Sequence, residues 1–248
     1  MGHTTGVFVT GTDTGVGKTL VSAALVRRFV QTGRSVGVMK PVETGVATGL
    51  PDQSDAARLT AAAGVDDPLE LVSPYRFSAP LAPFAAASEQ GQVIKLEEIV
   101  RRYTRLAARH SCIVVEGAGG LLVPMGKDWD MAVLISHLRL PVVVVGRVGL
   151  GGINHALLTL EALERRQIPV IAVVLNETAP AATSAQQEQC ASTVALLRER
   201  VTVPLLGPLP YQQQVDSIWS EAVECVAGSR PISELAGSIW KELAGKSE

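Results

Sequence analysis

The segment Gly11–Thr19 reads GTDTGVGKT and lies between a short apolar run, Val7–Thr10, and an amphipathic stretch, Lys18–Thr32. We interpret the run as a strand and the stretch as a helix that ends at Gly33. A bound phosphate needs several convergent backbone N–H donors, a flexible cation and a helix amino terminus. The glycine-rich turn, Lys18 and the start of the predicted helix supply all three. The segment therefore predicts a phosphate-binding loop.

The glycine spacing departs by one residue from the usual P-loop pattern. Five residues lie between Gly11 and Gly17, where the usual pattern has four. The position between a strand and a helix still favours a P-loop over an ordinary glycine-rich turn. We expect Lys18 to reach the β- and γ-phosphates and the Thr19 hydroxyl to bind Mg²⁺. The expected nucleotide contacts in this loop are Thr14, Gly15, Val16, Gly17, Lys18 and Thr19.

The composition excludes several classes of protein. The chain has 248 residues, of which 47% are hydrophobic and 19% charged, and this excludes a disordered protein. The net charge of -2 disfavours nucleic acid or anionic lipid as a partner. We find no signal peptide and no apolar run of the roughly 18 residues that span a bilayer. The three cysteines have neither disulfide nor zinc spacing. The sequence therefore predicts a soluble cytoplasmic protein.

Short apolar runs alternate with amphipathic stretches along the chain. The further predicted strands are Val36–Lys40, Cys112–Glu116, Val142–Val145, Val170–Leu175 and Leu205–Leu209. The further predicted helices are Asp52–Ala63, Leu96–Arg109, Ile153–Arg166, Ser184–Arg200 and one near Ile232–Leu243, with an irregular stretch at Asp66–Gln92. Continuously apolar strands are covered on both faces. We predict an α/β fold, in which residues 1–248 form a single P-loop NTPase-like domain with a mostly parallel sheet and helices on both faces.

Ligands of such sheets bind outside the carboxyl ends of the strands. Glu116 ends one strand and precedes three glycines in the next four residues, so it is suited to holding Mg²⁺, directly or through water. Lys40 ends another strand and is either a solvated strand end or a second cation for a transferred phosphoryl group. Asp55, on its own, is more simply an acidic residue at a helix start. Asn176 follows a strand where P-loop proteins often read the base, and an amide can both donate to and accept from adenine. No Asn-Lys-x-Asp signature is present, which favours ATP over GTP.

Five segments together resemble the dethiobiotin synthetase family along almost the whole chain. They are 11–19 (GTDTGVGKT), 40–45 (KPVETG), 54–56 (SDA), 115–120 (VEGAGG) and 151–156 (GGINHA). The resemblance implies that Thr19, Asp55 and Glu116 hold Mg²⁺ and that Lys40 is the catalytic lysine. It also implies that Thr44 contacts the substrate, that Asn176 contacts adenine, and that Gly117 and Gly119 lie at the nucleotide. The segment 211–248 matches less clearly.

The implied reaction converts 7,8-diaminopelargonic acid, CO₂ and ATP into dethiobiotin, ADP and phosphate. The implied enzyme is a homodimer in which the other subunit holds the substrate carboxylate through Leu150, Gly151 and Asn154. The first-turn N–H groups of the helix that begins there are suited to a carboxylate. A plain glycine-rich helix start is the alternative.

Three other classes are weaker interpretations. Chromosome-partitioning ATPases carry a lysine early in the P-loop, whereas this chain has Asp13 there. Cobyrinate-type amidoligases need an added glutaminase, for which 248 residues leave no room. A nucleotide-binding regulatory module leaves Lys40 and Thr44 unexplained.

Overall fold

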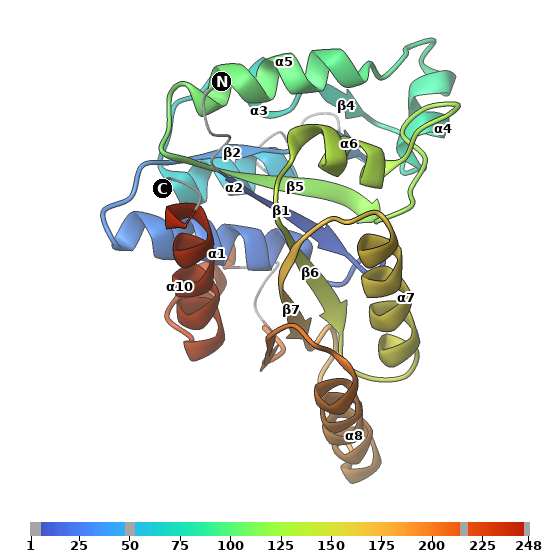
Figure 1. Cartoon of the computed structure of the whole chain (residues 1–248), viewed down its shortest axis with the longest axis vertical. Coiled ribbons are helices and arrows are strands. Elements are labelled where there is room, and N and C mark those ends of the chain that lie inside the picture. The colour runs from blue at the N-terminus through green and yellow to red at the C-terminus, as the bar shows by residue number, and fades with distance from the viewer. Residues whose placement is uncertain (1–5, 48–52, 214–217, 246–248) are drawn as a thin grey trace.

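The computed structural model describes residues 6–47, 53–213 and 218–245. Its main sheet has six strands in the order β2-β5-β1-β6-β7-β8, and neighbouring strands in it are parallel (Figure 1). These strands are β1 (Gly6–Gly11), β2 (Val36–Met39), β5 (Cys112–Gly120), β6 (Val142–Arg147), β7 (Val170–Asn176) and β8 (Leu205–Leu209). A small second sheet pairs β3 (Val42–Thr44) with β4 (Tyr75–Phe77). The predicted α/β fold with a mostly parallel sheet is confirmed.

Helices cover both faces of the main sheet. They are α1 (Lys18–Gln31), α2 (Asp55–Ala63), α3 (Leu69–Val72), α4 (Pro83–Glu89), α5 (Leu96–Ala107), α6 (Met131–Leu138), α7 (Gly152–Arg165), α8 (Ser184–Arg200), α9 (Trp219–Ala227) and α10 (Arg230–Ala244). On one face, α1 packs against α2, α9 and α10. Buried side chains of α5, α6 and α7 form the core of the other face. Helix α8 projects from the end of the molecule below β7 in Figure 1.

Strand β1 shows why the strands lack an alternating pattern. Val7 and Val9 belong to the core on the α1 face, whereas Phe8 between them belongs to the opposite core. All three are fully buried. Successive side chains of a strand point to opposite faces, so a strand covered on both sides is apolar throughout. The central position of β1 places the P-loop at the middle of the sheet's carboxyl edge.

The register of β2 and β5 joins two predicted site residues. Met39 pairs with Val115, and the strands run parallel. The next residues, Lys40 and Glu116, are therefore neighbours at the carboxyl edge. Val9 of β1 pairs with Glu116, which places this acid next to the strand that leads into the P-loop. The sheet thus assembles residues that are distant in sequence.

Several elements differ from the predictions. Strand β5 continues to Gly120 rather than ending at Glu116, and α6 and α9 were not predicted. The stretch 66–92, predicted to be irregular, contains α3, β4 and α4. Pro83 occupies the first turn of α4, where a missing N–H costs nothing. Helix α2 begins at Asp55, and the predicted start at Asp52 lies outside the described residues. Across residues 6–47, 53–213 and 218–245, the helices are too short or too polar to span a bilayer.

Candidate active site

The P-loop connects β1 to α1 through glycines in the left-handed region. Gly15 has φ 72° and Gly17 has φ 92°. A Cβ added at Gly17 would lie 2.2 Å from Nδ2 of Asn176, so contact and backbone conformation both require glycine there. Asn176 is buried and donates from Nδ2 to the carbonyl of Val16 at 3.1 Å. The end of β7 therefore braces the P-loop from behind.

Lys18 is folded into the loop that it follows. Its Nζ donates to the Asp13 carbonyl at 2.9 Å, and the residue is 7% exposed. A Cβ on Gly11 would come within 2.8 Å of this nitrogen, so the glycine makes room for the ammonium. Burial, followed by the charge of Lys40, lowers the pKa of Lys18 to about 8. An anion in the loop would offset both effects.

Four side chains, from α1, α2, β5 and the residue after β2, form one polar cluster beside the P-loop. Nζ of Lys40 lies 2.6 Å from Oε1 of Glu116 and 2.7 Å from Oδ2 of Asp55. The Thr19 hydroxyl lies 3.0 Å from Oδ1 of Asp55 and 2.9 Å from Oε1 of Glu116, and its single proton serves one of them at a time. Lys40 also donates to the carbonyl of Gly117 at 3.2 Å. The sheet thus brings together the predicted metal ligands and the predicted catalytic lysine.

The cluster is buried, and its charges control one another. Burial acts to lower the pKa of Lys40, but the charges of Glu116 and Asp55 outweigh it and raise that pKa. Burial also acts to raise the pKa of Asp55, and the charge and hydrogen bond of Lys40 reverse that effect and lower it. We therefore treat Lys40 as a cation and Asp55 as an anion near neutral pH.

The donor set fits a hard divalent cation. Mg²⁺ takes oxygen ligands, and Thr19, Asp55 and Glu116 present a hydroxyl and two carboxylates. Oε2 of Glu116 is buried and has no hydrogen-bond partner among the described residues. A free carboxylate oxygen in the interior is costly and is available to a cation or its water. Among the described residues, no three His, Cys, Asp or Glu side chains gather around one point, so a metal here would also need the Thr19 hydroxyl or substrate oxygens.

A second ionic contact ties the P-loop to the turn after β6. Oδ2 of Asp13 accepts from Nη2 of Arg147 at 2.8 Å, while Oδ1 accepts from the Thr14 amide at 2.7 Å. Nδ1 of His155 on α7 lies 4.0 Å from the same Oδ2. Asp13 stands where partitioning ATPases carry a lysine, and its charge is thus paired with an arginine of the same chain.

One cavity of about 730 Å³ opens in front of this cluster. Its lining includes these predicted site residues: Thr14, Gly15, Gly17, Lys18, Thr19, Lys40, Thr44, Asp55 and Gly119. The segment Pro80–Pro83 forms an apolar wall beside them. The cavity is therefore charged at one side and apolar at another.

Other predicted site residues lie outside this lining. Asn176 lies behind the P-loop, and a second cavity of about 480 Å³ begins at the following residue, Glu177. Leu150, Gly151 and Asn154 lie at the start of α7 and are exposed, with Leu150 85% exposed. Within the described chain they contribute nothing to the main cavity.

The structure adds cavity residues that sequence reasoning missed. Glu43 is 6% exposed, and its carboxylate accepts from the amides of Asp55 and Ala56. Burial, and then the charge of Asp55, raise the pKa of Glu43. Arg58 lines the same cavity and stacks on the Trp219 ring at 4.4 Å. Glu43 belongs to the quoted segment KPVETG, but nothing in that pattern indicates a backbone partner.

Comparison with known proteins defines the class first. A family model described as an AAA domain matches residues 5–218. Among solved structures, the MinC:MinD cell division complex of Aquifex aeolicus superposes with a TM-score of 0.53 at 16% identity, covering 97% of this chain and 96% of that chain. At this identity the likeness concerns the fold alone, and it agrees with the P-loop NTPase-like architecture.

Curated relatives define the particular family. The ATP-dependent dethiobiotin synthetase of Anaeromyxobacter dehalogenans strain 2CP-C is 53% identical over 71% of this chain and 78% of its own length. That of Thermodesulfovibrio yellowstonii is 38% identical over 88% of this chain and 95% of its own length. The chain belongs to the ATP-dependent dethiobiotin synthetase family of enzymes.

Proposed function

We propose that this chain is an ATP- and Mg²⁺-dependent ligase that closes the ureido ring of dethiobiotin from 7,8-diaminopelargonic acid and CO₂. The observation that carries the proposal is the contact of Lys40 with Glu116 and Asp55, because Lys40 and Asp55 line the same cavity as the P-loop Lys18. Two lysines at one phosphate site exceed what nucleotide binding needs. They suit a reaction in which an anion meets a triphosphate.

The proposed reaction has three steps. An amine of the substrate attacks CO₂ and loses a proton, which gives a carbamate. A carbamate oxygen attacks the γ-phosphorus, the bond to the leaving ADP oxygen breaks, and a carbamic–phosphoric anhydride forms. The second amine attacks the carbamoyl carbon, loses a proton and expels phosphate as the ring closes. The free energy of ATP hydrolysis thereby drives formation of the second C–N bond.

The residues of the site divide this chemistry between them. Lys18 and the loop amides bind the phosphates, while Lys40 opposes the negative charge that spreads over the transferred phosphoryl group. Thr19, Asp55 and Glu116 would hold Mg²⁺, which shields the charge of the phosphates when bound. Thr44, at the end of β3, offers a hydroxyl to the substrate in the same cavity.

We place the adenine near Asn176, with Gly117 and Gly119 beside the phosphates. Oδ1 of Asn176 is buried and has no hydrogen-bond partner in the described part of the chain, so it is available to the amino group of a base. The second cavity, lined by Glu177 and Tyr211 among others, offers space next to it. This arrangement supports ATP as the nucleotide.

The substrate's carboxylate requires a separate binding site, because the apolar chain of the substrate holds the carboxylate away from the amines. We propose that the enzyme is a homodimer and that Leu150, Gly151 and Asn154 of the partner subunit form that binding site. The exposure of the start of α7 supports this arrangement. The apolar wall Pro80–Pro83 suits the chain of the substrate.

Mixing two inactive variants tests the shared site. We expect Lys18→Ala and Asn154→Ala homodimers each to be poorly active, and mixed dimers to regain activity because one of their two sites is intact. Subunit exchange is verified by differently tagged chains, and the rate is compared with that of the unmixed variants. A monomer in analytical ultracentrifugation, or verified mixed dimers without regained activity, would contradict the proposal.

The proposed reaction is tested directly with purified protein, ATP, Mg²⁺, diaminopelargonic acid and ¹³C-labelled bicarbonate. We expect dethiobiotin to appear by mass spectrometry with one labelled carbon and one phosphate released per ring. Omitting ATP is the control. Phosphate release that does not depend on the diamine, with no dethiobiotin formed, would favour a nucleotide-hydrolysing module instead.

A further inference from the structure

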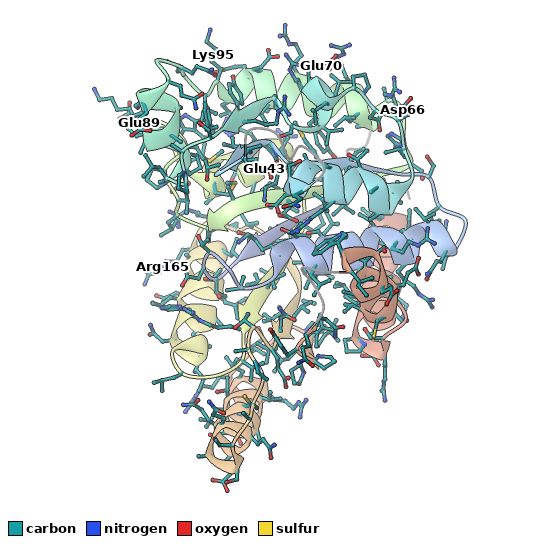
Figure 2. The ribbon with its side chains drawn as sticks, turned by 180° about the vertical axis from the view of Figure 1, so that it is seen from behind. Glu43, Asp66, Glu70, Glu89, Lys95 and Arg165 are labelled. Carbon is teal, nitrogen blue, oxygen red and sulfur yellow. The ribbon has the colours of Figure 1, made fainter. Side chains whose placement is uncertain are left out.

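Helix α2 begins with three amides that lack partners within the helix. The Ala57 amide donates to the Ser54 hydroxyl at 3.1 Å, which is an ordinary local cap. The other two amides, those of Asp55 and Ala56, donate to a side chain of β3. Their acceptors are Oε1 and Oε2 of Glu43, at 2.5 and 3.3 Å. In Figure 2, Glu43 lies beside one end of α2 and Asp66 lies beyond the other. Because Asp66 follows the helix in sequence, the end beside Glu43 is the amino end.

Glu43 reaches this position because of β3. The strand pairs with β4, with Glu43 opposite Arg76 in the backbone register. Glu43 precedes Asp55 by 12 residues in sequence, and its carboxylate accepts from the Asp55 amide. Strand β3 thus connects Thr44, at the substrate side of the cavity, with the first turn of α2.

A carboxylate buried at this point needs compensation from its surroundings. Glu43 is 6% exposed and close to the negative Asp55, and the described ion pairs include none that neutralises Glu43. Burying such a charge is costly unless its hydrogen bonds are satisfied. The two amides and the positive end of the helix dipole provide that compensation. A neutral glutamine would avoid the charge but could accept from only one of the two amides.

The residue held by Glu43 is a proposed metal ligand. The backbone of Asp55 is fixed by Glu43, while its carboxylate faces Thr19 and Lys40 on the other side. We propose that Glu43 is a positioning residue, which orients Asp55 toward Mg²⁺ without touching the metal. The inference rests on the proposed function, because it assumes that Asp55 is a metal ligand there.

The test compares two capping residues of the same helix. Glu43→Gln keeps the size of the side chain, but its amide nitrogen would face one of the two N–H groups. Ser54→Ala removes the other cap and leaves the Asp55 amide bonded. Both variants lose one acceptor at the same helix end, so we expect both to lower the melting temperature similarly. Only the Glu43 variant should disturb Asp55.

The readout is binding of Mn²⁺ to the ADP complex, followed by electron paramagnetic resonance, and it requires no turnover. We expect Glu43→Gln to weaken Mn²⁺ binding about tenfold, because mutating a hydrogen-bond partner of a metal ligand typically lowers metal affinity by that much. Ser54→Ala should leave Mn²⁺ affinity within about twofold of the wild type, and neither variant should change metal-free ADP affinity. Glu43→Asp, with its carboxylate drawn back by one methylene, should also weaken Mn²⁺ and is available if the glutamine variant does not fold.

The double variant with Asp55→Asn completes the test. If Glu43 acts through Asp55, adding Glu43→Gln to Asp55→Asn should weaken Mn²⁺ no further. Additive losses, equal losses in the Ser54 variant, or unchanged affinity in both Glu43 variants would overturn the proposal. If Asp55→Asn alone leaves Mn²⁺ affinity unchanged, the proposed metal set is wrong and the role of Glu43 fails with it. If only the Glu43 variants are without effect, the metal set stands.

Discussion

Replacing Lys18 by alanine should reduce turnover by roughly 1,000-fold or more. Losses in kcat of this size are typical when a cation that contacts the transferred phosphoryl group is removed. The Lys18 ammonium is held inside the P-loop by the Asp13 carbonyl, to which it donates at 2.9 Å. ATP affinity should fall as well, because the same ammonium binds the phosphates in the ground state. The measurement is the rate of dethiobiotin formation together with ADP affinity by calorimetry.

Lys95→Ala is a matched control for this variant. Lys95 is exposed at the upper edge of the molecule in Figure 2, and it lines neither of the two cavities described above. We expect its turnover to equal that of the wild type. Retention of a tenth or more of the activity in Lys18→Ala would mean that the GTDTGVGKT segment is not the phosphate site of the reaction.

Lys40→Gln should lower kcat by about 100-fold or more while ADP binding survives. A group that stabilises charge developing in the transition state affects kcat more than KM. Lys40 also neutralises Glu116 and Asp55, so its loss should destabilise the free protein by about 3 kcal/mol, as when one partner of a buried pair is removed. Mg²⁺ should recover part of that stability, because it binds the same carboxylates.

The measurements for Lys40→Gln are steady-state kinetics and melting temperatures with and without Mg²⁺. We expect Mg²⁺ to raise the melting temperature of the variant more than that of the wild type. Loss of ATP affinity with unchanged kcat would assign Lys40 to nucleotide binding. An equal Mg²⁺ shift in both proteins would place the metal away from Glu116 and Asp55.

Sequence reasoning singled out Lys18, Lys40 and Glu116 because each ends a strand or opens a helix with a recognisable pattern. Asp55 stood out as a metal ligand only through the family resemblance. Lys18 and Thr19 follow a glycine-rich turn, and Lys40 and Glu116 end apolar runs. Their contact depends on the pairing of Met39 with Val115, and a register between strands more than 70 residues apart leaves no mark in either segment. Lys40 could therefore be singled out from the sequence, whereas its contacts with Glu116 and Asp55 could not.

The missed features have no periodic pattern of their own. Strands β3 and β4 have three residues each, too few to show an alternation. Glu43 interacts with backbone amides, which every residue type carries, so no partner residue marks the contact. Helix α6 does carry a signal, since Asp130 caps it by accepting from the Val133 amide at 3.0 Å. The helix has only eight residues, so a clear helical period does not follow the cap.

The contact between Asp13 and Arg147 makes one attachment of the P-loop sensitive to ionic strength. The two side chains are 44% and 36% exposed, so dissolved ions screen their attraction. The pair of Lys40 with Glu116 is almost fully excluded from solvent and is screened far less. Rising salt therefore loosens the tie between the P-loop and the turn after β6 while the interior charges keep their arrangement. The attachment of the P-loop to the turn after β6 thus responds to ionic strength, whereas the buried charge cluster beside the loop responds far less.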